Sequence, residues 1–161
     1  VSKFPRIVLG FNSNENHQRI AENYQAQIKK NLGIQVEIQS EEWKVYLNRL
    51  QSDTPDIYRL GWLADYPDPD NFLNLMTSYS ENNHTGWGSK DFDQLIERGS
   101  SISDKEERRS VYSKAQKLLT EEAAPVYPIY SMVAHSLVSE RAKDFPINSL
   151  GRRVFKETSL K

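Results

Sequence analysis

Apolar and polar positions alternate with two different periods along the first third of the chain. Residues Arg6 to Phe11 form a short apolar run that predicts a strand. From Glu15 the apolar positions recur every three to four residues, which predicts a helix that ends at Gly33. The expected inward face of this helix consists of Ile20, Ala21, Tyr24 and Ile28. Strict alternation then predicts a strand with one buried face, carrying Ile34, Val36 and Ile38.

The pattern next predicts a second helix and a third strand. Ser40 is expected to cap a helix that buries Trp43, Leu47 and Leu50. Residues 53–55, Asp-Thr-Pro, break this helix, and the apolar run 57–62 predicts a buried strand. Strands separated by single helices make consecutive βαβ units, which favour parallel pairing and right-handed crossovers. The predicted fold class is therefore α/β, with a mixed sheet flanked by helices.

The second half of the chain predicts three helices joined by loops. Pro69 suits the first turn of a short helix, Ser89 is expected to cap the next one, and Ser103 with Glu106 forms a capping box for the third. Pro125 ends the third helix. The residues expected to face inward in these helices are Phe72, Leu73, Met76, Phe92, Leu95, Ile96, Val111, Ala115, Leu118 and Leu119.

Three apolar runs near the end of the chain predict further strands. The first two are Val126–Tyr130 and Met132–Val138, and Pro128 suggests an edge position for the first. Val154 and Phe155 predict one last short strand, which has no obvious partner.

Composition and charge exclude several classes of protein. Hydrophobic residues make up 37% of the 161 positions, and 21 basic against 22 acidic residues leave a net charge of −1. This balance gives no basic surface for nucleic acid, and no apolar run is long enough to span a membrane. The absence of cysteine excludes disulfide and thiol chemistry without fixing the compartment. Because the chain starts without methionine or a signal peptide, we expect it to be part of a longer protein.

Candidate chemistry concentrates after the predicted central strand. Asp65, Asp68 and Asp70 lie among two prolines, directly beyond the apolar run. Open α/β sheets bind ligands just past the carboxyl ends of their strands, so a carboxylate here is a candidate binding group. Asp68 and Asp70 also fit plain turn and helix-capping roles. Asp65 fits these roles less well, because it follows the apolar run at once and precedes both prolines.

The same stretch carries a resemblance to a known family. Residues Trp62-Leu-Ala-Asp-Tyr-Pro-Asp-Pro69, followed by Asn71-Phe-Leu73, resemble the signature of the oligopeptide-binding proteins of bacterial ABC importers, extracellular solute-binding family 5. Weaker matches in the same order are Ile20-Ala21, Asn31-Leu-Gly-Ile34, Glu42-Trp43, Phe92-Asp93, Leu95-Ile96 and Ala124-Pro-Val-Tyr-Pro-Ile-Tyr130. The resemblance implies that residues 1–142 form the carboxyl-terminal lobe of a periplasmic-binding-protein-like fold. It also implies that residues 143–161 are a tail that returns to an amino-terminal lobe, which this chain lacks.

The resemblance implies roles for individual residues. Asp65 matches the aspartate that pairs with the α-amino group of a bound peptide. Arg59 matches an arginine that meets the carboxylate of short ligands, and His17 matches a histidine that serves the carboxylate of longer ones. Trp62 and Trp87 complete the expected ligand-binding set. Plainer alternatives remain, namely a structural ion pair for Arg59, a surface histidine for His17 and a plug in a satellite core for Trp87.

The resemblance further implies a non-enzymatic protein that binds oligopeptides between two lobes and delivers them to a membrane permease. It implies an extracytoplasmic location, in the periplasm or lipid-anchored at the cell surface, and no cofactor. Related binders carry nickel complexes, opines or oligosaccharides, so a different solute stays open. A hydrolase built on Asp65, Asp68 and Asp70 is a further alternative, but no nucleophile lies beside a base and no metal-ligand spacing occurs. A structural or interaction module is the last alternative.

Overall fold

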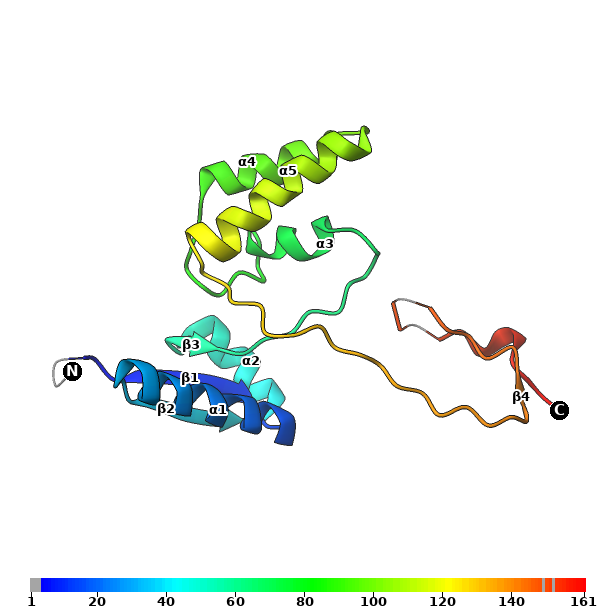
Figure 1. Cartoon of the computed structure of the whole chain (residues 1–161), viewed down its shortest axis with the longest axis horizontal. Coiled ribbons are helices and arrows are strands. Elements are labelled where there is room, and N and C mark those ends of the chain that lie inside the picture. The colour runs from blue at the N-terminus through cyan, green and yellow to red at the C-terminus, as the bar shows by residue number, and fades with distance from the viewer. Residues whose placement is uncertain (1–3, 149, 152) are drawn as a thin grey trace. The chain divides into compact units, whose positions relative to one another are not determined.

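The computed structural model describes residues 4–148, 150–151 and 153–161, and it forms two compact units. The first unit extends to Trp62 and the second begins at Leu63. Each unit is described separately below (Figure 1).

The first unit is built on a three-stranded parallel sheet with the strand order β2-β1-β3. The strands are β1 (Ile7–Asn12), β2 (Val36–Glu41) and β3 (Ile57–Tyr58). Strand β1 pairs with β2 along its whole length, from Ile7 opposite Val36 to Asn12 opposite Glu41. Helices α1 (Glu15–Leu32) and α2 (Trp43–Ser52) make the two crossovers that parallel strands require. The predicted α/β class and parallel βαβ units are confirmed.

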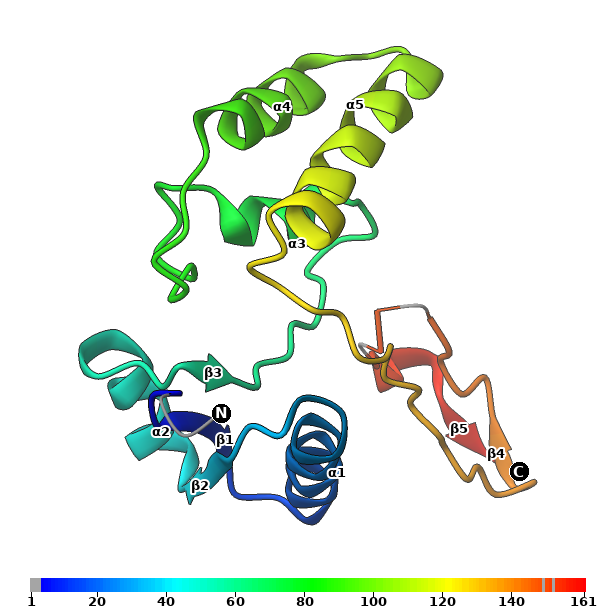
Figure 2. The ribbon, with the colours of Figure 1, turned by 60° about the vertical axis from the view of Figure 1, so that its left-hand side comes forward.

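The two helices cover opposite faces of this sheet (Figure 2). On the α1 face, Leu9, Phe11 and Val36 pack with Ala21 in a buried cluster, which Tyr24 and Ile28 flank. On the other face lies Gly10, where a Cβ atom would come within 2.6 Å of Pro55 Cγ and 3.4 Å of the Tyr46 ring. Glycine at position 10 therefore lets α2 and the following loop approach the central strand closely.

The ends of α1 follow the sequence prediction, whereas the start of α2 does not. The Asn14 side chain caps α1 at its beginning, and Gly33 ends it with φ of 70°. The predicted Ser40 cap of α2 is wrong, because Ser40 still belongs to β2 and the Glu42 carboxylate accepts from the backbone of Lys44 and Val45. Since the helix begins at Trp43, its buried positions are Tyr46 and Leu50, and Trp43 is 45% exposed.

The predicted strand over residues 57–62 is much shorter in the structure. Strand β3 has two residues, and it pairs with Leu9 and Gly10 of β1. One further backbone hydrogen bond runs from Arg59 N to Gly10 O at 3.0 Å. Beyond it Leu60 and Trp62 are exposed, so the expectation of burial fails at these two positions.

The second unit packs short helices around one core. Its elements are α3 (Asp70–Leu73), the 3₁₀ turn η1 (Asn74–Met76), α4 (Lys90–Ser101), α5 (Lys105–Lys117) and the π-helical turn η2 (Leu118–Glu122). The buried core residues are Leu73, Phe92, Ile96, Tyr112, Ala115 and Leu119. Most of these core residues were predicted to face inward. Phe72 was predicted to face inward as well, but it is 48% exposed. The cap of α5 was misplaced by one residue, since the Asp104 side chain accepts from Glu107 N.

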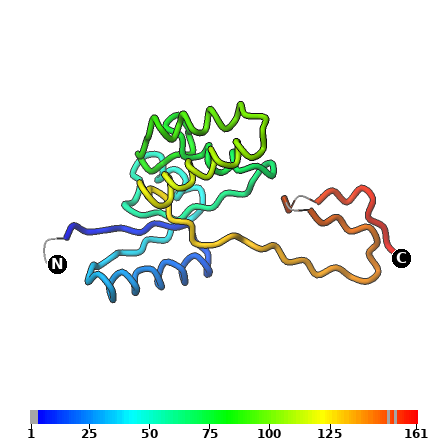
Figure 3. The backbone as a smooth tube through the Cα atoms, turned by 45° about the horizontal axis from the view of Figure 1, so that its top comes forward, coloured from blue at the N-terminus to red at the C-terminus, as the bar shows by residue number. Residues whose placement is uncertain are grey.

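The predicted strands in the last part of the chain are wrong. Residues 126–138 pair with no described strand, and Figure 3 follows them as a run without coils. An antiparallel pair does form, between β4 (Ala142–Lys143) and β5 (Ser159–Leu160). The 3₁₀ turn η3 (Phe155–Glu157) occupies the position of the predicted last strand. Apolar side chains alone do not make a strand, because its backbone also needs a neighbour to bond with.

Candidate ligand-binding site

The carboxyl edge of the first unit's sheet has the topology of a binding site. Strand β1 is central, and the crossovers through α1 and α2 lead to its two opposite neighbours. Ligands of open α/β proteins bind at such a reversal of strand order, outside the carboxyl ends of the strands. His17 follows the end of β1 and Arg59 follows the end of β3, so the fold brings both predicted residues to this edge. Two buried oxygens at the ends of β1 and β2, Asn12 Oδ1 and Glu41 Oε2, have no hydrogen-bond partner among the described residues.

His17 lies half-buried in the first turn of α1. Its Nδ1 atom is 3.2 Å from the Asn12 carbonyl oxygen, which can only accept, so Nδ1 carries the proton and donates. Burial lowers the pKa of His17 below its ordinary value, the Asn12 hydrogen bond opposes this, and the positive charge of Arg59 lowers the pKa further. The imidazole is therefore neutral at neutral pH. A bound anion beside the imidazole would favour its charged form, and the dipole of α1 also favours an anion at this end of the helix.

Arg59 is half-buried and is held through its backbone. Its N–H donates to Gly10 O, and its own carbonyl accepts from the Tyr46 hydroxyl at 2.8 Å. The guanidinium lies over Gly61, where a Cβ atom would be 3.4 Å from Arg59 Nη2. Among the described residues of the first unit, no carboxylate forms an ion pair with this guanidinium. The alternative role of Arg59 as half of a structural ion pair therefore has no support within this unit.

His17 and Arg59 together give this edge its chemistry. Arg59 is close enough to lower the pKa of His17, and the dipole of α1 adds positive potential at its amino end. A guanidinium, an imidazole and a helix terminus at one strand edge can hold a carboxylate. Trp62, the last residue of this unit, is 41% exposed and offers an aromatic surface.

Asp65 lies in the second unit, in a bend that leads to α3. Its side chain is exposed, and its backbone N–H donates to Asn71 Oδ1 at 3.1 Å. Asn71 is only 8% exposed, so its buried side-chain amide supports the bend at Asp65. The sequence pattern identified Asp65 but not its support by Asn71.

Asp68 and Asp70 have the structural roles that the plain interpretation predicts. The Asp68 carboxylate meets the Arg108 guanidinium in a bidentate pair of 2.7 and 2.9 Å, and it also accepts from Asp70 N. The Arg108 hydrogen bonds hold the pKa of Asp68 below its ordinary value. Asp70 accepts from the hydroxyl groups of Tyr66 and Tyr112. Both carboxylates thus tie the turn to α5 and are already engaged.

Trp87 lies in a loop that a single amide organises. Its ring meets Phe92 edge-on, with centroids 5.3 Å apart, and packs against the core of the second unit. Asn83 Nδ2 donates to the carbonyl groups of Met76, Thr77 and Trp87, while its Oδ1 accepts from Thr85. The position of Trp87 agrees with the predicted satellite-core alternative. Asn83 was missed as a structural residue, although Asn-x-Thr-Gly is a turn-forming sequence.

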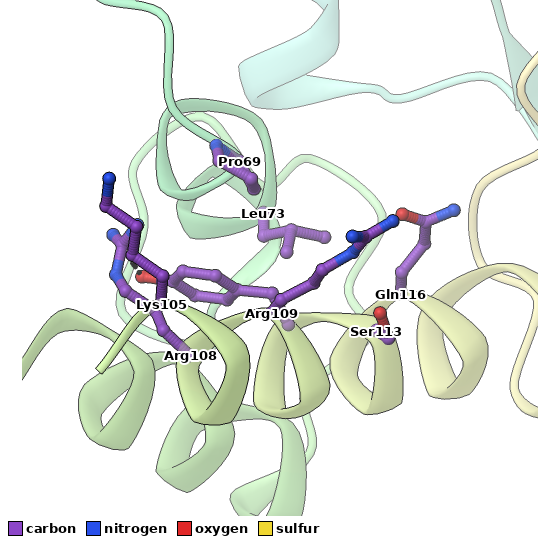
Figure 4. Close-up of a pocket in the computed structure, with 8 residues that line it drawn as sticks. Pro69, Leu73, Lys105, Arg108, Arg109, Ser113 and Gln116 are labelled. Atoms are coloured by element: carbon purple, nitrogen blue, oxygen red, sulfur yellow. Dashed lines mark hydrogen bonds between the residues drawn. The ribbon is translucent and has the colours of Figure 1, made fainter. Parts of the chain in front are cut away.

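A shallow groove of about 360 Å³ lies between α3 and α5 in the second unit (Figure 4). Pro69 and Leu73 form one side, Tyr112 lies on α5, and Lys105 and Arg109 stand at the rim. None of the five predicted ligand-binding residues lines it. Within the described residues, no group of three or more His, Asp or Glu side chains can hold a metal ion, and no helix could cross a membrane.

Comparison with known proteins identifies the family. Residues 3–84 match the model of the bacterial extracellular solute-binding proteins, family 5 middle region. The chain is 35% identical over 161 residues to the oligopeptide-binding protein OppA of Bacillus subtilis, covering 99% of this chain and 29% of that protein. It therefore spans less than a third of the length of this relative.

Two solved structures agree in fold. The murein tripeptide-binding protein MppA of Escherichia coli matches with a TM-score of 0.83 and 34% identity, over 91% of this chain and 29% of that one. Listeria monocytogenes OppA bound to peptide matches with a TM-score of 0.78 and 29% identity, over 97% and 30% of the two chains. These proteins are binding proteins and not enzymes, as the sequence predicted. The chain thus belongs to the bacterial extracellular solute-binding proteins of family 5.

Proposed function

We propose that this chain is the carboxyl-terminal ligand-binding lobe of the substrate-binding component of a peptide ABC importer. The observation that carries the proposal is the proximity of His17 and Arg59 at the carboxyl edge of the sheet, with no carboxylate of the first unit in an ion pair with the guanidinium. The Arg59 guanidinium supplies positive charge at the carboxyl edge of the sheet. A peptide carboxylate is a ligand of matching charge and geometry.

In this proposal the two ends of the peptide meet opposite charges. Arg59 and His17 bind the carboxylate, and Asp65 pairs with the α-amino group, because an ammonium enclosed away from water needs a counter-charge. Trp62 and Trp87 provide aromatic contacts along the ligand. The peptide backbone lies extended, so its termini and hydrogen bonds give affinity while side chains are tolerated.

The remaining parts of the proposal concern the whole protein. A separate amino-terminal lobe closes over the ligand by a hinge motion, and the closed form delivers it to the membrane permease on the extracytoplasmic side. The tail 143–161 returns to that lobe. The exposed apolar side chains before the tail support this role, since such surface normally contacts a partner.

The test is native mass spectrometry of the full-length protein, with sequencing of the ligands it releases, followed by calorimetry. We expect co-purified peptides of mixed sequence. The Asp65→Asn variant should bind them about ten- to a hundredfold more weakly, because a charge-assisted hydrogen bond contributes roughly 1.5–3 kcal/mol. Asp91→Asn, an exposed aspartate on α4, is the matched control and should bind normally.

Other outcomes would reject parts of the proposal. A single non-peptide mass would replace the peptide by another solute of the family. Unchanged peptide affinity in the Asp65→Asn variant would remove the amine-pairing role while leaving the peptide ligand in place.

A further inference from the structure

The position of Arg59 depends on a buried hydroxyl group that does not belong to the ligand site. Tyr46 of α2 is completely buried, with 0% of its surface exposed. Its hydroxyl oxygen is 3.0 Å from Gly10 O and 2.8 Å from Arg59 O. One phenolic proton thus joins the carbonyl of the central strand and the carbonyl of the residue that carries the guanidinium.

Regular structure does not fix Arg59 by itself. Strand β3 ends at Tyr58, and the last bond of the ladder is the one from Arg59 N to Gly10 O. Gly10 O therefore receives both Arg59 N–H and the Tyr46 hydroxyl, and the two bonds close a small network at the end of the strand. Burial also raises the pKa of Tyr46 well above its ordinary value, which keeps the hydroxyl protonated and able to donate.

The geometry points to Tyr46 as a positioning residue that holds the Arg59 guanidinium at the carboxyl edge, beside His17. The inference rests on the proposed function for its ligand, a peptide carboxylate. Tyr46 itself touches no ligand, because it is buried beneath the backbone on the α2 face of the sheet. Removing its hydroxyl frees the Arg59 peptide group, and the guanidinium then loses its fixed distance to His17.

A purely structural role for Tyr46 predicts different results. The Tyr46 ring packs against Gly10, and Leu50 is the other buried residue of α2. A substitution that keeps the aromatic ring therefore keeps this packing. Tyr46→Phe is that change. Tyr58→Phe is the matched control, since Tyr58 lies in β3 next to Arg59 and no hydrogen bond of its hydroxyl is among the described contacts.

The first readout is the pKa of His17, measured by NMR on the full-length protein without ligand. The Arg59 charge lowers this pKa, so Arg59→Gln should raise it. Tyr46→Phe should raise it in the same direction, because the guanidinium moves away, and Tyr58→Phe should leave it unchanged. An unchanged His17 pKa in Tyr46→Phe overturns the inference, and this readout does not depend on whether the ligand is a peptide.

The second readout is peptide affinity by calorimetry. Tyr46→Phe should bind a peptide about fivefold more weakly, the effect of one hydrogen bond of about 1 kcal/mol. In the Arg59→Gln background the same change should have no further effect, since its influence passes through Arg59. Additive losses in the double variant contradict the inference. A wild-type protein that binds no peptide rejects the proposed function instead, and the His17 readout still decides the role of Tyr46.

A third readout needs no variant. In the wild-type protein the Tyr46 hydroxyl proton should exchange slowly with water and show a cross-peak to the Arg59 amide proton. Rapid exchange without this cross-peak contradicts the inference even where Tyr46→Phe does not fold.

Discussion

Three aspartates within six residues of one motif have different surroundings. The Asp68 carboxylate accepts hydrogen bonds from Nη1 and Nη2 of Arg108 and from the backbone N–H of Asp70. Asp70 accepts from two tyrosines. Asp65 is exposed, on a bend that Asn71 supports. The family motif is the ground for proposing that Asp65 meets the ligand.

The Asp68–Arg108 pair should stabilise the second unit in a pH-dependent way. We expect Asp68→Asn to reduce the free energy of unfolding by about 1 kcal/mol at pH 7, because a bidentate, partly exposed pair is lost. The pKa of Asp68 is lowered in the folded protein, so this stabilisation is complete above its unfolded pKa, about 3.9. It is lost as pH falls below that value, through the folded pKa. Denaturant unfolding of wild type and Asp68→Asn at pH 6 and pH 3 measures the stabilisation and its loss at low pH.

Glu81→Gln is the control, an exposed loop carboxylate with no ion pair among the described residues. A difference between wild type and Asp68→Asn that stays constant from pH 6 to pH 3 would show that the carboxylate charge does not stabilise the fold.

Peptide binding should tighten as pH falls through the titration range of His17. The pKa of His17 is lowered in the free protein, and a bound carboxylate raises it, so binding takes up a proton. Affinity should increase between pH 7.5 and 5.5, and the slope should disappear in His17→Gln. Calorimetry in buffers of different ionisation enthalpy counts the proton directly. Equal affinity and no proton uptake would place the carboxylate away from His17.

At the residue scale, motif resemblance proposed ligand roles for Asp65, Arg59 and His17, but it gave no indication of the residues that support them. Tyr46 was missed because its importance lies in a hydroxyl aimed at two carbonyls from distant parts of the chain, which no local pattern reveals. Asn71 and Asn83 were also missed, although their hydrogen bonds lie within the local turn.

At the scale of elements, the helices and the first two strands were predicted well, and the later strands were not. The helical faces of α1 and α5 follow from local periodicity. The caps of two helices were misplaced, by two residues in α2, from Ser40 to Glu42, and by one residue in α5, from Ser103 to Asp104. Strand β3 stopped at Tyr58, and residues 126–138 formed no strand with any described partner, because strand pairing is decided by neighbours far away in sequence.

The loop between η1 and α4 gives a prediction at this scale. Asn83→Asp should lower the free energy of unfolding by about 2 kcal/mol, since the side chain loses its donors to three backbone carbonyls and brings a negative charge near them. Near-UV circular dichroism should show that the Trp87 ring has lost its fixed environment against Phe92.

Asn82→Asp is the matched control on the neighbouring exposed residue, whose side chain donates to no described carbonyl. Equal stability of the two variants would mean that Asn83 does not organise the loop.

At the scale of the whole molecule, the chain spans under a third of the length of OppA of Bacillus subtilis. Its surface includes an exposed apolar segment. Residues 126–138 expose several large apolar side chains, with Met132 at 78%, Val133 at 73% and Leu137 fully exposed. Monomeric proteins rarely leave such a contiguous apolar run in water. The proposed amino-terminal lobe would cover it and supply backbone partners.

The isolated chain should therefore behave differently from the full-length protein. We expect the backbone amides of residues 126–138 to exchange with solvent within seconds in the isolated chain and to be protected in the full-length protein, because strand hydrogen bonds form only with the other lobe. Peptide binding by the isolated chain should be weak or undetectable, since in our proposal the other lobe supplies half of the cleft. The double variant Met132→Ser/Leu137→Ser should self-associate less than wild type, with Lys29→Ser/Lys30→Ser on the exposed end of α1 as control. Micromolar peptide binding by the isolated chain would mean that one lobe forms the whole site, and rapid amide exchange in the full-length protein would mean that the other lobe leaves this segment uncovered.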